Sequence, residues 1–171
     1  MQIAWISAVC MLLVCGAQTV RSEPRLASNG PAAGKMIALV ANARGAQRYV
    51  CTVDKDKPRW VAEGPDADLF DASGEFIGHH YRDLTWEALD GSRVTGATTA
   101  QEVLEHDVTP WTLAAAHQTK RPGVFADVSS IQRTDTRGGD PPAEACDAAK
   151  RNAVRSVPYT AVYWFYRGNS G

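Results

Sequence analysis

Residues 76–94 read FIGHHYRDLTWEALDGSRV, and this stretch decides how the fold is interpreted. Asp90-Gly91 is a strong signal for a β-hairpin, because a type I′ turn needs positive φ at both of its central residues. With this pair at the tip, Glu87 is predicted to face Val94, and Trp86 is predicted to face Thr95. Side chains alternate along a strand, so Trp86 and Glu87 are expected on opposite faces of the sheet.

The rest of the chain contains further short segments that are typical of strands and are separated by turn residues. The last segment is dense in aromatic and β-branched residues, which favours a strand buried on at least one face. Roughly eight to ten short strands predict an all-β fold, an antiparallel β-sandwich or a barrel, in a single domain over residues 36–171. The predicted strands are 36–41, 45–53, 59–62, 67–71, 75–78, 85–89, 92–98, 111–117, 124–134 and 157–166, and for 111–117 a helix is the alternative because of its three alanines.

One or two short helices are expected within this domain. Thr99 and Glu102 have the spacing of a capping box, so Ala100 to His106 is predicted to be a short helix, with an irregular loop as the alternative. Residues 143–151, which contain Cys146, are predicted to form one or two helical turns.

The first 22 residues have the features of a secretory signal peptide. They form an apolar run followed by small and polar residues, and the run is too short for a membrane span. Cleavage is expected after Ala17 or after Ser22. Residues 23–35 are rich in proline, glycine and polar residues and are predicted to be a flexible lead-in. Because no other segment is apolar enough to span a bilayer, we expect an exported protein, either periplasmic or secreted.

Two cysteines, Cys51 and Cys146, remain after removal of this signal. In an oxidising compartment a disulfide between them is the simplest interpretation. The alternative is a pair of thiolate metal ligands, which the spacing disfavours because neither cysteine lies in a C-x-x-C or C-x-x-H cluster.

The charge of the chain is close to balanced, with 18 Lys and Arg against 19 Asp and Glu. This composition argues against a protein that tracks the phosphate backbone of a nucleic acid. The expected partner is therefore an unknown ligand, or an envelope or extracellular component.

His80 is the candidate metal ligand. His79 and His80 are adjacent, so in a strand their imidazoles project to opposite faces and cannot both bind one ion. His80 would need a distant partner, and imidazole with carboxylate would suit copper or zinc. No cofactor is required by any motif, and the candidate partners are His106, His117, Asp83 and Glu87.

Two other kinds of site compete with a metal centre. An acid and base pair for hydrolysis could form from His80 and a nearby carboxylate, with Asp83, Glu87 and Asp90 as the candidates. A non-catalytic binding site is the leading hypothesis, because the chain is rich in tryptophan and tyrosine and carries no catalytic motif. The residues predicted to line it lie beside the hairpin or add charge to it: His80, Tyr81, Trp86, Glu87 and Arg133.

The sequence also resembles a known family, the one catalogued as domain of unknown function 3455, which is found in exported proteins. The matching pieces cover nearly all of the chain beyond the signal: Gly45-x-Gln47-x-Tyr49-x-Cys51, Trp60, Ala67-x-Leu69-x-Asp71-x-x-Gly74, His80-Tyr81, Thr85-Trp86-Glu87, Asp90-Gly91-Ser92, Pro110-Trp111, Ile131-Gln132-Arg133-x-x-Thr136-x-Gly138-Gly139-x-Pro141, Cys146 and Val157-Pro158-Tyr159-x-Ala161-x-Tyr163-x-Phe165-Tyr166. Family members usually carry Gly-Pro where this chain has Asp83-Leu84. The resemblance implies export and a single domain, and it supplies no activity, cofactor or catalytic residue.

Overall fold

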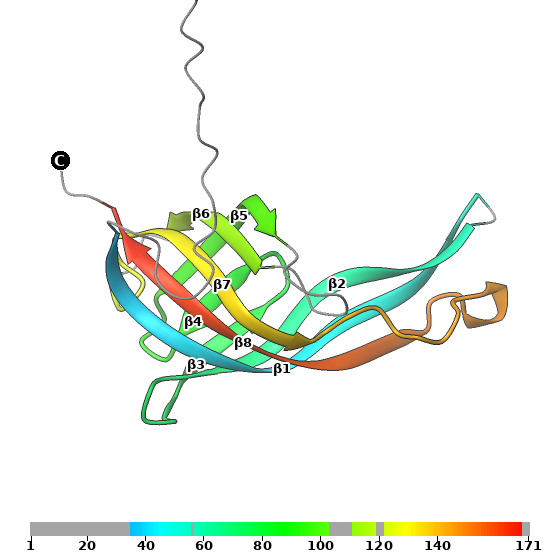
Figure 1. Cartoon of the computed structure of the whole chain (residues 1–171), viewed down its shortest axis with the longest axis horizontal. Coiled ribbons are helices and arrows are strands. Elements are labelled where there is room, and N and C mark those ends of the chain that lie inside the picture. Colours follow the sequence, from blue (N-terminus) through cyan, green and yellow to red (C-terminus); the bar gives the residue numbers. More distant parts are fainter. Residues whose placement is uncertain (1–34, 56, 103–110, 119–121, 169–171) are drawn as a thin grey trace, which may run out of the picture.

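Eight antiparallel strands form a closed barrel in the computed structural model, which describes residues 35–55, 57–102, 111–118 and 122–168 (Figure 1). Each strand pairs with the next along the chain, and β8 pairs with β1 to close the ring. The all-β prediction is confirmed, and of its two alternatives the barrel is correct. The strands are β1 (Met36–Asp54), β2 (Lys57–Phe70), β3 (Phe76–Tyr81), β4 (Thr85–Ala88), β5 (Arg93–Glu102), β6 (Trp111–Gln118), β7 (Val128–Gly138) and β8 (Val154–Arg167).

Alternation along the strands fills the inside of the barrel. Along β8 the buried side chains occur at every second position from Tyr159 to Phe165, as expected for a strand with one face on the core. The adjoining strand β1 places small residues beside them, since Ala41 pairs with Tyr163 and Ala43 pairs with Ala161. Large side chains therefore come mainly from β8 and from the hairpin of β3 and β4, and Phe125 adds an aromatic ring that packs against Phe165.

The prediction of helices is wrong within the described residues. Thr99 to Glu102 continue strand β5 instead of capping a helix, and residues 103–106 lie outside the described part of the chain. Between residues 143 and 151 only a single 3₁₀ turn forms, Ala148–Lys150, capped by the Asp147 side chain, which accepts a hydrogen bond from the backbone N–H of Lys150. The predicted signal peptide and nearly all of the lead-in also lie outside the described residues.

The hairpin of β4 and β5 differs from its prediction by one residue of register. Trp86 pairs with Val94 and not with Thr95, because the loop has three residues and not two. The Ala88 carbonyl accepts a hydrogen bond from the Gly91 N–H, and only Gly91 has positive φ, as in a type I turn closed by a glycine bulge. Asp90 holds this loop through its carboxylate, which accepts hydrogen bonds from the N–H groups of Ser92 and Val124.

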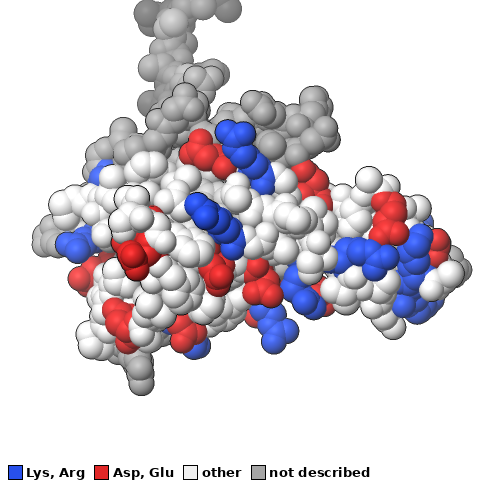
Figure 2. All heavy atoms as spheres, turned by 90° about the horizontal axis from the view of Figure 1, so that it is seen from below, with Lys and Arg blue, Asp and Glu red and all other residues white. Residues whose placement is uncertain are grey.

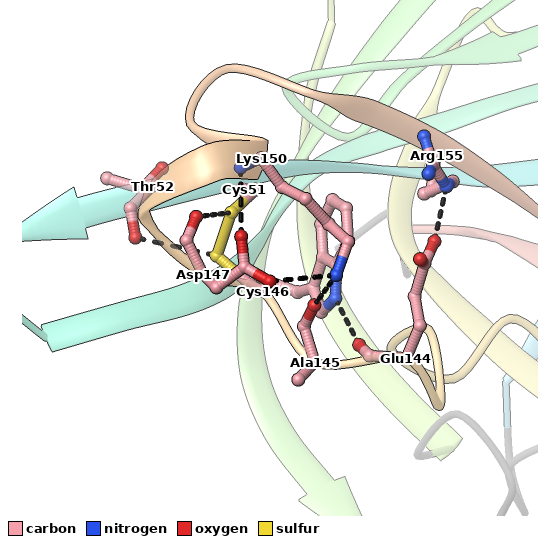
Figure 3. Close-up of polar contacts among 9 residues, drawn as sticks. Cys51, Thr52, Glu144, Ala145, Cys146, Asp147, Lys150 and Arg155 are labelled. Atoms are coloured by element: carbon pink, nitrogen blue, oxygen red, sulfur yellow. Dashed lines mark hydrogen bonds and ion pairs between the residues drawn. A yellow bond between two sulfur atoms is a disulfide. The ribbon is translucent and has the colours of Figure 1, made fainter.

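The ends of β1 and β2 and the start of β8 project beyond the barrel as an arm (Figure 1). A disulfide between Cys51 and Cys146 fastens the segment before β8 to β1, as predicted. Figure 3 shows the polar contacts around it, in which Lys150 pairs with Asp147 and Arg155 pairs with Glu144. On the face drawn in Figure 2, acidic and basic side chains of the described residues are interspersed over both the body and the arm.

β1 and β2 lie close together at Gly45. A Cβ atom at this position would lie 2.2 Å from the carbonyl oxygen of Asp66 and 2.4 Å from the Cα of Ala67, both of which belong to the backbone. We expect Gly45→Ala to lower the free energy of unfolding by about 1–3 kcal/mol, because the two strands must separate to admit the methyl group. Urea denaturation measures this change.

Gly168→Ala is the matched control for that substitution. Its Cβ would meet the Ser129 side chain at ordinary contact distances of 3.6 and 3.8 Å, so we expect little change in stability. Equal losses in the two variants would contradict the close approach at Gly45.

Candidate functional site

His80 lies inside the barrel and not on an open face. It projects inward from β3, is 1% exposed and stacks on Trp86 of β4, with ring centroids 4.3 Å apart. The Tyr163 ring packs edge-on against the imidazole, with ring centroids 4.9 Å apart. The imidazole Nδ1 lies 2.8 Å from the carbonyl oxygen of Thr85, so Nδ1 carries the proton and donates it. Burial lowers the pKa of His80 to about 3, so the ring is neutral at ordinary pH.

Tyr81 and Glu87 lie on the other side of the same sheet. The Tyr81 hydroxyl donates to the Glu87 carboxylate at 2.6 Å, and Arg93 donates to the same oxygen at 2.8 and 3.1 Å. The hydrogen bond from Tyr81 and then the contacts of Arg93 hold the pKa of Glu87 below its ordinary value. Because Glu87 pairs across the sheet with His79 and Trp86 pairs with His80, Glu87 and His80 face opposite ways. The predicted acid and base pair of these two residues therefore does not form.

Arg133 also lies in the interior, near His80 and Trp86. Together with Thr136, Tyr159 and Tyr163 it forms a group that we call the interior tyrosine cluster. Arg133 pairs with Tyr163 between β7 and β8, which puts both on the inner face. The charge of Arg133 acts to lower the pKa values of Tyr163 and His80, although burial is the larger influence on both and raises the pKa of Tyr163. Of the five predicted site residues, the structure thus brings together His80, Trp86 and Arg133, and it separates Tyr81 and Glu87 from them.

Sequence reasoning missed three members of this cluster. Tyr159 and Tyr163 are four residues apart in a predicted strand, so alternation places them on one face with Phe165, but aromatic residues in a buried strand are typical of a core and did not single these two out. Thr136 carried no comparable signal, because a register shift in β7 between Thr134 and Arg137 decides that it is buried while Asp135 is exposed.

The metal hypothesis stays a prediction. Within residues 35–55, 57–102, 111–118 and 122–168 no group of three or more His, Cys, Asp and Glu side chains could hold an ion. Two of the proposed partners fall outside what is described, namely His106 and the side chain of His117. Asp83 lies at the turn between β3 and β4, and Glu87 lies on the outer face, where its carboxylate accepts hydrogen bonds from Tyr81 and Arg93.

A groove lies where strand β2 extends past the end of strand β3. Strand β2 pairs with β1 along its whole length, but its pairing with β3 starts only at Asp66, opposite Tyr81. Beyond that point the edge of β2 and the turn after β3 border a hollow of about 590 Å³. Its lining combines an aromatic ring with charges of both signs: Arg48, Glu63, Gly64, Pro65, Asp66, Tyr81, Arg82 and Asp83.

The turn that borders the groove has an unusual backbone. Asp83 and Leu84 have φ values of 61° and 46°, a region that non-glycine residues seldom occupy. A proline ring fixes φ near −65°, so the Gly-Pro pair usual in the resembled family could not form this turn. The groove in this chain therefore has a wall shaped by its own Asp83-Leu84 pair.

Arg48 and Glu63 form one ion pair within the groove, at 3.4 Å between Arg48 Nη2 and Glu63 Oε2. Among the described residues no ion pair within 4.0 Å involves Arg82, Asp66 or Asp83. Arg82 thus adds a guanidinium to the lining of the groove, and Asp66 and Asp83 add two carboxylates. The backbone of Arg82 crosses directly over Gly64, where a Cβ would lie 2.8 Å from the Arg82 Cα, so both sides of the groove are fixed relative to each other.

Comparison with known proteins gives a family and no further relative. No curated protein and no solved structure matches the chain. No helix in the described part of the chain is long and apolar enough to cross a membrane. The disulfide fits an oxidising compartment. A family model described as protein of unknown function matches residues 31–167, nearly the whole of the chain, and the protein therefore belongs to this family, DUF3455.

Proposed function

We propose that this protein is an exported, non-catalytic binding protein that holds a small polar ligand with charges of both signs in the groove beside Tyr81. The observation that carries the proposal is the lining of the groove, where Arg82, Asp66 and Asp83 have no ion pair among the described residues. Charged groups around a concave site orient a ligand, and an aromatic ring such as that of Tyr81 adds contact area.

A binding role is favoured over catalysis by the placement of the histidines. His80, the histidine of the predicted acid and base pair, is buried in the interior, where its Nδ1–H donates to the Thr85 carbonyl. His79 lies outside the groove and pairs with Asp68 at 3.0 Å. The groove lining holds carboxylates and guanidiniums but no histidine, cysteine or serine, so it offers recognition by charge and hydrogen bonds.

Titration calorimetry with amino acids, short peptides and fragments of envelope glycans tests this proposal. We expect at least one zwitterionic compound to bind, and we expect Arg82→Ala to weaken its binding by about tenfold or more, because a hydrogen bond to a charged group contributes about 1.5–3 kcal/mol. Asp83→Asn should weaken it to a similar degree if the cationic part of the ligand lies at this carboxylate.

Arg137→Ala is the control, since Arg137 is an exposed arginine of β7 and not part of the groove lining. If the ligand binds Arg82→Ala and Asp83→Asn as tightly as the wild type, its binding site is not the groove. Conversion of the bound compound to a product would overturn the non-catalytic assignment.

A further inference from the structure

Strand β2 has an open edge between the groove and the end of the arm. Its pairing with β1 runs from Phe70 to Lys57, whereas its pairing with β3 ends at Asp66. Among the described strands, none lies on the other side of β2 between Lys57 and Asp66. An unpaired strand edge is a template on which another chain can add a strand, so the partner of this edge is a question that the fold raises.

The hydrogen bonds of β1 show which groups of this edge face outward. Cys51 donates its N–H to the Ala153 carbonyl and accepts from the Asn152 N–H, so its backbone groups point away from β2. Cys51 pairs with Trp60 of β2, and pairs in an antiparallel ladder alternate between those that exchange hydrogen bonds and those that do not. The N–H and C=O of Trp60 therefore point away from β1, and so do those of Ala62, two residues further on.

Two prolines limit this edge to a short window. Pro58 and Pro65 lack an N–H, and the same alternation turns their carbonyls outward, which is a position where a strand tolerates proline. Between them, Trp60 and Ala62 each present both a donor and an acceptor. A window of this length suits a short extended peptide better than continuous pairing with the β2 strand of a second copy.

The arm holds this edge in a fixed place. The Trp60 indole N–H donates to the Glu144 carbonyl at 2.8 Å, and the Arg155 guanidinium lies over the Trp60 ring at 5.8 Å. The disulfide joins Cys51, the cross-strand partner of Trp60, to Cys146. Because an edge that is already ordered loses little conformational freedom on binding, it is suited to receive a peptide.

Charges along the edge favour one direction for the added chain. Asp66 and Asp83 supply carboxylates at the groove end. Lys57 and Arg59 are exposed at the arm end, and no ion pair within 4.0 Å involves them among the described residues. A peptide that continues the direction of β3, antiparallel to β2, starts in the groove and ends at the arm. Its amino terminus then lies by carboxylates and its carboxyl end by cations, which is the complementary arrangement.

We infer that the ligand of this protein is the amino-terminal end of an extended peptide, which starts in the groove and adds a strand along the open edge of β2. The peptide ammonium pairs with Asp66 and Asp83, and its first carbonyl accepts from Arg82. The peptide backbone exchanges hydrogen bonds with Trp60 and Ala62. This inference rests on the groove as the binding site, and it adds the class of ligand and the mode of recognition.

The test uses the intact mature protein and the peptide Ala-Thr-Val-Thr-Val-Thr-Val-Glu. At about 3.3 Å per residue this peptide is long enough to follow the edge from the groove toward the end of the arm. Titration calorimetry compares it with the dipeptide Ala-Thr, which reaches only the groove. We expect the longer peptide to bind about tenfold or more tightly, and acetylation of its amino terminus to weaken it about tenfold. Equal affinities of the two peptides would overturn the added strand.

Methylation of single peptide nitrogens separates backbone pairing from side-chain contacts. Successive N–H groups of a strand point to opposite sides, so only every second one faces β2. We expect a methyl group on one of two neighbouring nitrogens to weaken binding by about tenfold, and a methyl group on the other to have an effect of about twofold or less. Equal losses at both nitrogens would contradict strand pairing.

A substitution on the protein tests the same contact from the other side. Ala62→Pro removes one outward donor, and Ala62→Thr is the matched variant because it keeps the N–H at this exposed position. We expect the threonine variant to bind the long peptide about fivefold or more tightly than the proline variant. Equal binding by the two would overturn the role of this edge. The methylated peptides are measured on the wild type, so they test the inference even if Ala62→Pro does not fold.

Failure of this inference and failure of the proposed function give different results. If Asp83→Asn weakens the binding of a zwitterionic compound, but the long peptide binds no more tightly than Ala-Thr, the groove is the site and the added strand is wrong. If no peptide and no other zwitterionic compound binds, both proposals are wrong. A dimer of the free protein that Ala62→Pro dissociates would assign the edge to a second copy and would also overturn the inference.

Discussion

Acidification from pH 6.5 to pH 4 is expected to lower the free energy of unfolding by about 3 kcal/mol through His80 alone. The pKa of this buried ring is lowered to about 3 in the folded protein, whereas an unfolded chain has its ordinary value of 6.5. Between these values the unfolded state binds a proton that the folded state does not. The contribution of His80 is therefore complete above pH 6.5 and is lost as the pH falls toward 3.

Urea denaturation at several pH values measures this slope, and His80→Asn isolates it. The asparagine amide does not titrate and keeps an N–H donor for the Thr85 carbonyl, so the variant should show a flatter dependence between pH 6.5 and pH 4 even if its overall stability is lower. The carboxylates whose pKa values are lowered, such as Glu87 and Asp90, also lose stabilising contacts in acid, but their losses are common to both proteins. The same slope in variant and wild type would contradict a buried neutral His80.

Replacement of Cys51 and Cys146 together by alanine is expected to lower the free energy of unfolding by about 4–5 kcal/mol. The bond joins residues 95 positions apart, and a cross-link over so long a loop removes much of the conformational freedom of the unfolded chain. In the folded protein it also holds the segment before β8 against the arm, where Trp60 donates a hydrogen bond to the Glu144 carbonyl. Chemical denaturation of the variant and the wild type measures the difference.

Reduction of the wild type should reproduce the loss, and the reducing agent should leave the double variant unchanged. Thiol titration of the denatured, unreduced mature protein should find no free thiol among these two cysteines. Two titratable thiols, or a double variant as stable as the wild type, would contradict the cross-link.

The local pattern of the sequence was sufficient to predict the strands, but not that they close into a barrel. The alternation in residues 85–94 and 157–166 correctly placed Trp86 and Glu87 on opposite faces and predicted a buried final strand. A barrel differs from a sandwich only through the pairing of β1 with β8, between residues such as Ala43 and Ala161. That contact joins segments from opposite ends of the domain, and no local pattern records it.

The hairpin register shows how a side chain can override a backbone preference. Asp90-Gly91 favours a two-residue turn, but the Asp90 carboxylate accepts hydrogen bonds from Ser92 and from Val124, which lies far along the chain. The three-residue loop with a single positive φ at Gly91 makes both contacts possible. The second of them depends on tertiary structure, so the sequence of the hairpin alone could not predict it.

The candidate sites were predictable only in part, for the same reason. Alternation already implied that His79 and His80 face opposite ways, and the structure extends this to Glu87, which lies with His79 on the outer face. The groove arises where β2 continues past the end of β3, next to a turn with positive φ at Asp83 and Leu84. Both features depend on the relative lengths of strands and on a backbone conformation that residue type does not favour.

Closure of the ring by β8 also sets when folding can finish during synthesis. Until this strand is made, β1 lacks its partner from Met36 to Val50, and the interior lacks Tyr159, Tyr163 and Phe165. A growing chain must therefore wait for nearly its last described residues before the barrel can form, as expected for a fold dominated by contacts between distant segments. Such a delay leaves one edge of β1 and one edge of β7 unpaired until late in synthesis, and an open strand edge can pair with another chain.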